Sequence, residues 1–456
     1  MKDKILWCLE MPLDSRAFLM QKWKIDKLAS TYDITIVVCN ENVGSCYLNP
    51  FGIKNFCRYC SKTVKESLKN SEVTIYEIPK ILNDVSSNNV DDLGAISTFI
   101  TKFRRTPNEI KLSLLRKSLN KLSSAGIIYK AQIESFLGGN SFKSLWTFGG
   151  RTNIAKAAVD AAVRKNVDYY CMELAGVDGK IHLSKNQRNF DSDYIQNKFS
   201  NYLKKIDRKD VKESAVFFEK KLKGEPTNDV VYYKPQKELE KRVALPGYDI
   251  IFLLSSLDER AALGGEWDPF YESQEQVCVW ISNKFPQYKY AVRYHPNQSY
   301  LSKKDLKKSK EYLEANGIMF FGPKSEISSY DLIPNAKIVV TFGSTISVEA
   351  AYQKKRVLVV GHSFSMGVLC HANSFSEIYF YLSNPEKIPL RKYRAMAYAH
   401  QIMNYSAEFC DVPYVTAPRN ILSNKHRIAI KSYFILTDKL ISITKRMNNI
   451  LHNLTV

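Results

Sequence analysis

The sequence predicts an α/β protein made of two domains, each built around a largely parallel sheet. Short apolar, β-branched runs alternate with helical stretches along most of the chain. This alternation occurs in two halves, and a polar, charged stretch over residues 185–245 lies between them. The chain has 456 residues, which suits two domains of ordinary size.

The first half begins with a strand, a helix and a second strand, the order that produces neighbouring parallel strands. The alanine-rich helix is strongly predicted, because alanine favours helices and Thr152 or Asn153 can cap the first turn. In chain order the expected elements are a strand at 4–10, a helix at 15–30, strands at 33–40 and 72–78, a mainly helical region at 81–135, a strand at 144–151, the alanine-rich helix at 153–166 and a strand at 167–176.

The second half repeats the alternation, which predicts right-handed crossovers and a doubly wound sheet. Its expected elements are a strand at 248–254, a helix at 273–285, a strand at 289–296, a helix at 303–317, a strand at 318–322, a short helix at 329–336, a strand at 337–344, a helix at 345–355 and a strand at 356–361.

The expected domains are an N-terminal acceptor-side α/β domain at residues 1–240, a C-terminal nucleotide-sugar-binding α/β domain at 241–420 and an amphipathic helix at 421–456. The tail is basic, and two interpretations remain open for it: a membrane-facing helix or a helix that packs back on the first domain.

The formal net charge of +20 is the strongest compositional anomaly. No nucleic-acid motif accompanies it, so we expect no nucleic-acid partner and favour anionic substrates and peripheral contact with an anionic membrane. No run approaches ~18 apolar residues, and the start of the chain lacks the apolar core of a signal peptide. We therefore expect a cytoplasmic protein at the inner face of the membrane. The Cys-x-x-Cys at 57–60 has no second pair, so no metal site is predicted.

The most informative stretch is "VVTFGSTISVEAAYQKKRVLVV" at 339–360. The strand ends at Gly343, and Ser344 and Thr345 open a helix whose free N–H groups could bind phosphate. Glu349 follows one turn later, where an acid can hold ribose hydroxyls. An ordinary helix cap followed by a surface glutamate is the alternative.

The stretch "VRYHPNQ" at 292–298 predicts a second polar strand end. Arg293 and His295 alternate on one strand face, so both could meet one anion, and His295 could donate to a phosphate or a leaving group. Pro296 stops the strand, and we assign Asn297 to substrate binding. A structural histidine at a turn is the alternative.

In the first half, Arg151 and Glu173 end two strands that are expected to be parallel neighbours. Glu173 could be a general base or a hydroxyl ligand, and Arg151 could bind an acidic sugar. A buried Arg–Glu bridge with a purely structural role is the alternative.

The stretch "SSLDERAALGGEW" at 255–267 places two acids just after a strand, where α/β sheets bind ligands. Asp258 could attack an anomeric carbon as a nucleophile. Glu259 could orient it at the substrate, and Ser256 could bind the donor. The alternative is that Asp258 only caps the helix that follows.

The linked motifs resemble those of a known protein family. The order "GR", "ExxG", "SSxDExxxxGxEW", "RxHPN" and "TxGSTxxxEAxxxxxxVLV" over roughly residues 140–365 resembles bacterial capsule and surface-polysaccharide biosynthesis proteins. Among these it looks most like the retaining β-Kdo glycosyltransferases. The resemblance implies a GT-B-like fold of two Rossmann-like domains facing a cleft, the donor CMP-Kdo and no metal cofactor.

Carried over by position, the resemblance makes Asp258 the catalytic aspartate and Glu173 an acid near the acceptor. It makes His295 and the Ser344–Thr345 pair donor-binding residues. The chain departs from the family where "KKRVL" replaces the common "GxPV" in the last motif.

These observations together predict a glycosyltransferase of capsule or O-antigen synthesis that transfers Kdo to a glycan or lipid-linked glycan. Two alternatives remain open: an inverting transferase that uses another nucleotide sugar, and a non-catalytic sugar- or lipid-binding scaffold.

Overall fold

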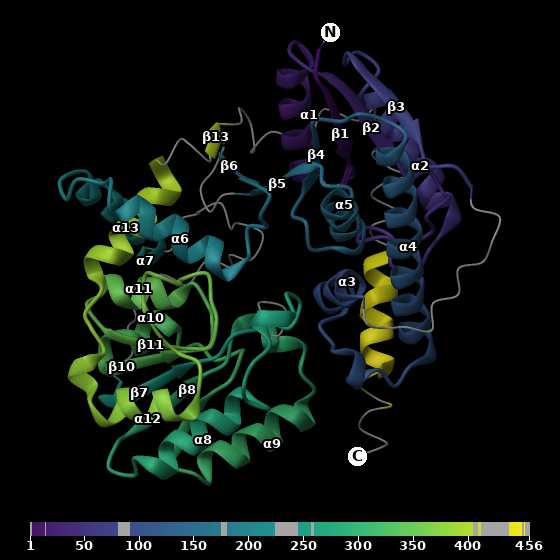
Figure 1. Ribbon diagram of the computed structural model, residues 1–456. Coiled ribbons are helices and arrows are strands. Elements are labelled where there is room, and N and C mark those ends of the chain that lie inside the picture. The colour runs from purple at the N-terminus through teal and green to yellow at the C-terminus, as the bar shows by residue number, and fades with distance from the viewer. Residues whose placement is uncertain are drawn as a thin grey trace. The chain divides into compact units, whose positions relative to one another are not determined.

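The computed structural model describes residues 2–13, 15–80, 92–174, 180–223, 245–256, 260–404, 409–411, 437–448 and 451. The chain forms two compact units (Figure 1). Unit 1 comprises Met1–Asn189 together with Ser406–Val456, and unit 2 comprises Phe190–Tyr405. Each unit has a mainly parallel sheet with helices on both faces, so the prediction of two Rossmann-like α/β domains is confirmed.

Unit 1 contains a sheet in the order β13-β6-β5-β4-β1-β2-β3. Strands β1 to β5 are parallel, β6 is antiparallel to β5, and β13 is antiparallel to β6. Its strands are β1 (Lys4–Cys8), β2 (Asp33–Val38), β3 (Val73–Glu77), β4 (Ser144–Phe148), β5 (Asp168–Leu174), β6 (Lys180–Lys185) and β13 (Phe409–Asp411). Its helices are α1 (Ser15–Ala29), α2 (Lys54–Ser67), α3 (Leu93–Phe103), α4 (Ser113–Gly138) and α5 (Asn153–Arg164).

Strand β1 shows why this sheet needs helices on both faces. Side chains alternate along a strand, and here both sets are apolar. Ile5 and Trp7 pack in one buried cluster, and Leu6 and Cys8 pack in the cluster on the opposite face. Helix α1 covers the first face, and α4 and α5 cover the second.

Unit 2 contains a six-stranded parallel sheet in the order β12-β11-β10-β7-β8-β9. Its strands are β7 (Tyr248–Leu253), β8 (Tyr290–Arg293), β9 (Ile318–Phe321), β10 (Ala336–Thr341), β11 (Arg356–Val360) and β12 (Cys370–Ala372). Its helices are α6 (Ser192–Leu203), α7 (Ala215–Leu222), α8 (Gln274–Lys284), α9 (Lys303–Glu314), α10 (Ser329–Leu332), α11 (Ile346–Tyr352), α12 (Phe375–Ser383) and α13 (Lys392–Asn404).

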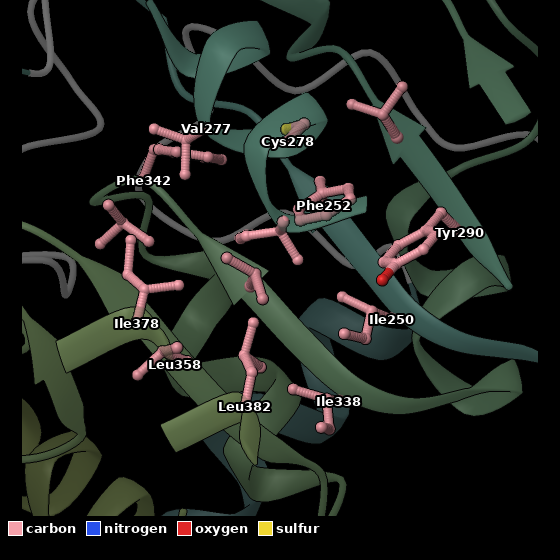
Figure 2. Close-up of a cluster of buried hydrophobic side chains, with 14 of the residues drawn as sticks. Ile250, Phe252, Val277, Cys278, Tyr290, Ile338, Phe342, Leu358, Ile378 and Leu382 are labelled. Carbon is pink, nitrogen blue, oxygen red and sulfur yellow. The ribbon is translucent and has the colours of Figure 1, made fainter. Parts of the chain in front are cut away.

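A buried hydrophobic cluster fixes one face of the unit 2 sheet (Figure 2). Ile250 and Phe252 of β7 lie in this cluster with Val277 of α8 and Leu382 of α12. Truncating a fully buried phenylalanine to alanine typically costs about 3–5 kcal/mol. This packing therefore holds the strand ends of the sheet in a fixed arrangement.

Both sheets have a point at which the strand order reverses. In unit 2 the chain runs outward from β7 to β9 and then returns to build β10, β11 and β12 on the other side of β7. In unit 1 the same reversal lies between β1 and β4. Open α/β sheets bind ligands in the crevice at this switch point, outside the carboxyl ends of the strands.

The unit boundaries differ from the expected ones. Helices α6 and α7 belong to unit 2, although the sequence analysis placed residues up to 240 in the first domain. Their apolar residues Phe199 and Phe218 pack in the second cluster of the unit 2 sheet, and Phe218 stacks on Tyr352. These contacts join segments that are distant in sequence, so local patterns could not indicate them.

The described part of the tail, a helix over residues 437–448, packs on unit 1. Ile441 lies in a cluster with Phe103 of α3 and Leu115 of α4. The Asn448 side chain accepts hydrogen bonds from the backbone N–H of Leu112, at 2.9 Å, and of Lys111. No helix within the described residues is long and apolar enough to cross a membrane.

Candidate functional site

The switch point of unit 2 lies between the carboxyl ends of β7 and β10. Ser255 and Ser256 follow β7, and Thr341 is the last residue of β10. Gly343 then turns the chain with a φ of +106°, a conformation that side-chain-bearing residues rarely adopt. The sequence analysis placed Ser256 and the Ser344–Thr345 pair at strand ends, and the structure places all three at this edge.

Three hydroxyl groups at this edge are buried without a partner among the described residues. They belong to Ser255, Ser256 and Thr341, and each side chain is at most 1% exposed. The backbone of Ser255 is fixed, because it exchanges two hydrogen bonds with the Gln274 side chain at 2.9 and 3.2 Å. Buried polar groups normally have partners, so three orphaned hydroxyls at a switch point indicate a place for a polar ligand.

The Ser344–Thr345 pair precedes α11. Ser344 is buried and Thr345 is exposed. The Ser344 carbonyl accepts hydrogen bonds from the Ser347 hydroxyl, at 2.7 Å, and the Ser347 N–H. These two local hydrogen bonds fix the turn after β10. Thr345 is the member of the pair that faces solvent.

Glu349 of α11 is buried and already has partners for both carboxylate oxygens. One oxygen forms an ion pair with Lys221 of α7 at 3.2 Å, and the other accepts a hydrogen bond from the Tyr330 hydroxyl of α10. This network joins three helices. A ribose hydroxyl, which the sequence analysis expected Glu349 to hold, would have to share these contacts.

Arg293, at the end of β8, does not meet an anion together with His295 as the sequence predicted. Its side chain is 5% exposed, and its guanidinium donates to the carbonyls of Gly322, at 2.6 Å, Ile327, at 2.8 Å, Tyr294 and Ser325. Burial lowers the Arg293 pKa to about 10. We therefore correct the assignment: Arg293 fixes the loop after β9, because carbonyls from that loop surround it.

His295 and Asn297 form the turn that follows β8. The His295 Nδ1 accepts a hydrogen bond from the Asn297 N–H at 3.1 Å, and the His295 N–H donates to the Gln298 side chain at 2.8 Å. A neutral ring that accepts at Nδ1 carries its proton on Nε2. His295 is half-buried, and this turn leaves its Nε2 as the ring nitrogen that could donate to a ligand.

Asp258 and Glu259 lie outside the described residues. The end of their motif lies within the described residues, and its side chains hold the fold together. Trp267 is buried and donates its indole N–H to the Phe190 carbonyl at 2.8 Å. The Glu266 carboxylate accepts hydrogen bonds from the backbone and the hydroxyl of Ser192 at the start of α6. The "GEW" part of the motif therefore fastens α6 to this edge of unit 2.

Arg260 directly follows the acid pair, and the sequence analysis did not single it out. Its side chain is 5% exposed and lies across the glycine turns that end β10 and β11. Its Nη1 donates to the Val360 carbonyl at 3.0 Å and to the Tyr271 hydroxyl. Arg260 could have been proposed as a site residue from the sequence, because it is an arginine that follows a strand end at the switch point.

In unit 1, Arg151 and Glu173 lie at the ends of the parallel neighbours β4 and β5, as predicted. The Arg151 guanidinium donates to two hydroxyls of α3, Thr101 at 3.0 Å and Ser97 at 3.5 Å. Glu173 is half-buried, and its Oε2 lies 3.4 Å from where a Cβ on Gly149 would be. The two side chains share an edge, but Arg151 has hydroxyl partners from α3.

Glu10 is a second residue that the sequence analysis missed. It follows β1 at the switch point of unit 1, and its Oε1 accepts a hydrogen bond from the Thr152 hydroxyl at 2.6 Å. Its Oε2 is buried without a partner among the described residues, and the side chain lines a cavity of about 40 Å³. Burial raises the Glu10 pKa to about 7, against the smaller lowering effect of the hydrogen bond from Thr152.

Among the described residues there is no group of three or more histidine, cysteine, aspartate or glutamate side chains that could hold a metal ion.

The comparisons with known proteins gave structural likenesses only. No protein-family model matches the chain, and no curated protein matches its sequence. The β-Kdo 2,7 transferase KpsC of Thermosulfurimonas dismutans is similar, with a TM-score of 0.40 and 15% identity, covering 67% of this chain and 89% of that chain. The β-Kdo 2,4 transferase of the same protein gives a TM-score of 0.37 and 12% identity, covering 57% and 79%.

A UDP-GlcNAc 2-epimerase from Neisseria meningitidis is similar over more of the chain, 88% of this one and 98% of that one, with a TM-score of 0.28 and 13% identity.

Proposed function

We propose that the protein is a glycosyltransferase of surface-polysaccharide synthesis that uses a nucleotide-activated acidic sugar. The observation that carries this proposal is the switch point of unit 2, where three buried hydroxyls without described partners lie beside the Gly343 turn. Rossmann-like sheets bind nucleotides at this position. The net charge of +20 favours an anionic ligand. The resemblance of the motifs to β-Kdo glycosyltransferases implies that this ligand is CMP-Kdo.

In this proposal unit 2 holds the donor and unit 1 holds the acceptor. The carboxylate of Asp258 attacks the anomeric carbon, and the bond from that carbon to the CMP phosphate breaks with its electron pair leaving on CMP. His295 donates to the departing phosphate. The acceptor hydroxyl then displaces Asp258 and loses its proton to a general base. Two displacements give net retention at the anomeric carbon.

A donor screen tests the proposal. The wild-type chain is incubated with CMP-Kdo, other CMP-linked acidic sugars and UDP-linked sugars, each with a glycan acceptor. The released nucleotide is identified, and the anomeric configuration of the product is read by NMR. We expect CMP release with retention, and a loss of at least about 100-fold in transfer rate for Asp258→Asn.

Each other outcome contradicts one part of the proposal. An inverted product, or full activity of Asp258→Asn, removes the nucleophile. Release of a uridine nucleotide would show that the donor is a UDP-linked sugar and not CMP-Kdo. If the chain binds a nucleotide or glycan but transfers nothing, it is a scaffold rather than an enzyme.

A further inference from the structure

Arg260 occupies a space that two glycines keep open. A Cβ on Gly361, which ends β11 with a φ of +79°, would lie 2.1 Å from the Arg260 Nη2. A Cβ on Gly343 would lie 3.3 Å from its Cδ. A side chain at either turn would collide with the arginine or crowd it. The edge of the sheet is thus shaped around a guanidinium.

Only the more distant carboxylate of Asp268 offsets the charge of Arg260 among the described residues, and it raises the Arg260 pKa less than burial lowers it. A guanidinium has five N–H donors, and Arg260 uses Nη1 for Tyr271 and Val360 while its Nε has no partner among the described residues. Within the described parts of the chain, no carboxylate lies close enough to Arg260 to form an ion pair, although the charge of Asp268 acts on it from farther away. A buried cation is costly without close partners, so the unpaired Nε of Arg260 favours an anion at this place.

Apart from the carboxylate of Asp268, the described groups near Arg260 are donors or neutral. The hydroxyls of Ser255, Ser256 and Thr341 lie at the same edge and also have no partner among the described residues. His371 of β12 is neutral at pH 7, because burial first, and His362 and Arg260 in addition, lower its pKa to about 4. Burial also lowers the pKa of Arg260 itself. The cluster therefore combines one fixed positive charge with several hydroxyls and complements an oxyanion.

We infer that Arg260, with the hydroxyls of Ser255, Ser256 and Thr341, forms an oxyanion-binding subsite at the switch point of unit 2. The inference deepens the proposed function and rests on it for the identity of the ligand. An oxyanion of a CMP-linked acidic sugar comes from either of two groups, the nucleotide phosphate or the sugar carboxylate. Arg260 matches both, because its planar fork can donate two parallel hydrogen bonds to either group.

Calorimetric titration of matched variants tests the subsite. Arg260→Gln removes the charge, and Arg260→Lys keeps the charge but loses the paired N–H donors of the guanidinium. Lys308→Gln is the control, because it removes an equal charge from the exposed face of α9. The probes are CMP, cytidine and free Kdo. We expect Arg260→Gln to weaken CMP binding by about 10- to 100-fold, with Arg260→Lys in between and Lys308→Gln unchanged.

The probes separate the two sources of the anion. If the phosphate occupies the subsite, cytidine binds every variant equally and only CMP is affected. If the carboxylate occupies it, the loss appears with Kdo and not with CMP. Equal affinities of Arg260→Gln and Lys308→Gln for all probes overturn the inference.

Inorganic phosphate separates this inference from the proposed function. At constant ionic strength, phosphate should raise the melting temperature of the wild type in a saturable way and leave Arg260→Gln unaffected. That result supports the subsite even if no nucleotide binds. If Arg260→Gln does not fold, Arg260→Lys and Ser256→Ala are compared instead. A phosphate effect of equal size in these variants and the wild type overturns the inference.

Discussion

Glu10→Gln stabilises the protein above pH 7 and leaves its stability nearly unchanged at pH 4.5. Burial raises the Glu10 pKa from 4.5 to about 7 in the folded state. Below pH 4.5 both states hold the proton, so Glu10 adds no penalty to folding. Between pH 4.5 and 7 the unfolded chain loses the proton more readily, and folding is opposed increasingly as the pH rises.

The expected gain follows from the size of this pKa change. One pKa unit corresponds to about 1.4 kcal/mol, so Glu10→Gln should be more stable than the wild type by up to about 3 kcal/mol at pH 8. Glutamine keeps an acceptor for the Thr152 hydroxyl. Urea unfolding at pH values from 4.5 to 8 measures the difference between the two proteins.

Glu72→Gln is the control for this comparison, because Glu72 is exposed in the same unit. The stability of Glu72→Gln should change with pH in the same way as that of the wild type. A Glu10→Gln protein whose stability runs parallel to that of the wild type from pH 4.5 to 8 would show that folding does not change the pKa of Glu10. The raised pKa would then be wrong.

Gly361→Ala destabilises unit 2 more than a glycine replacement at another left-handed turn. The new Cβ would lie 2.1 Å from the Arg260 Nη2, and the guanidinium cannot move without leaving its contacts with Val360 and Tyr271. A left-handed conformation alone costs a residue with a Cβ about 1–2 kcal/mol. With the displaced arginine we expect a total of about 3–4 kcal/mol.

Gly317→Ala isolates the backbone cost. Gly317 has a φ of +73°, and nothing lies within 4 Å of the position of its Cβ. Chemical unfolding of both variants gives the difference, which is the cost of the clash with Arg260. Equal losses in the two variants would mean that the guanidinium moves freely and is not held over the turn.

The repeated alternation of strands and helices was enough to predict both sheets. Short apolar strands such as β7 and the alanine-rich α5 carry their own local signals, and these were confirmed. Strand β6 was not predicted, because "KIHLSK" is largely polar and lacks the apolar run of the inner strands. Strands β12 and β13, of three residues each, were also not predicted.

In the candidate site, local sequence predicted positions at strand ends but not the partners of the side chains. The strand-end positions of Ser256, Ser344 and His295 followed from local sequence. The partners of Glu10 and Arg260 did not, because Thr152 lies 142 residues from Glu10 and Val360 lies 100 residues from Arg260. Contacts of this separation arise only when the strands assemble. The buried state of Arg293 is of the same kind, since loop carbonyls some 30 residues away surround it.

A crystal structure of the protein with CMP tests most directly whether the switch point of unit 2 binds a nucleotide. We expect density for one CMP per chain at the carboxyl ends of β7 and β10, with its phosphate within hydrogen-bonding distance of Arg260 or the neighbouring hydroxyls. Cytidine at saturating concentration serves as the control for the phosphate contact. CMP bound only elsewhere on the chain, or an empty switch point at saturating CMP, would contradict the account.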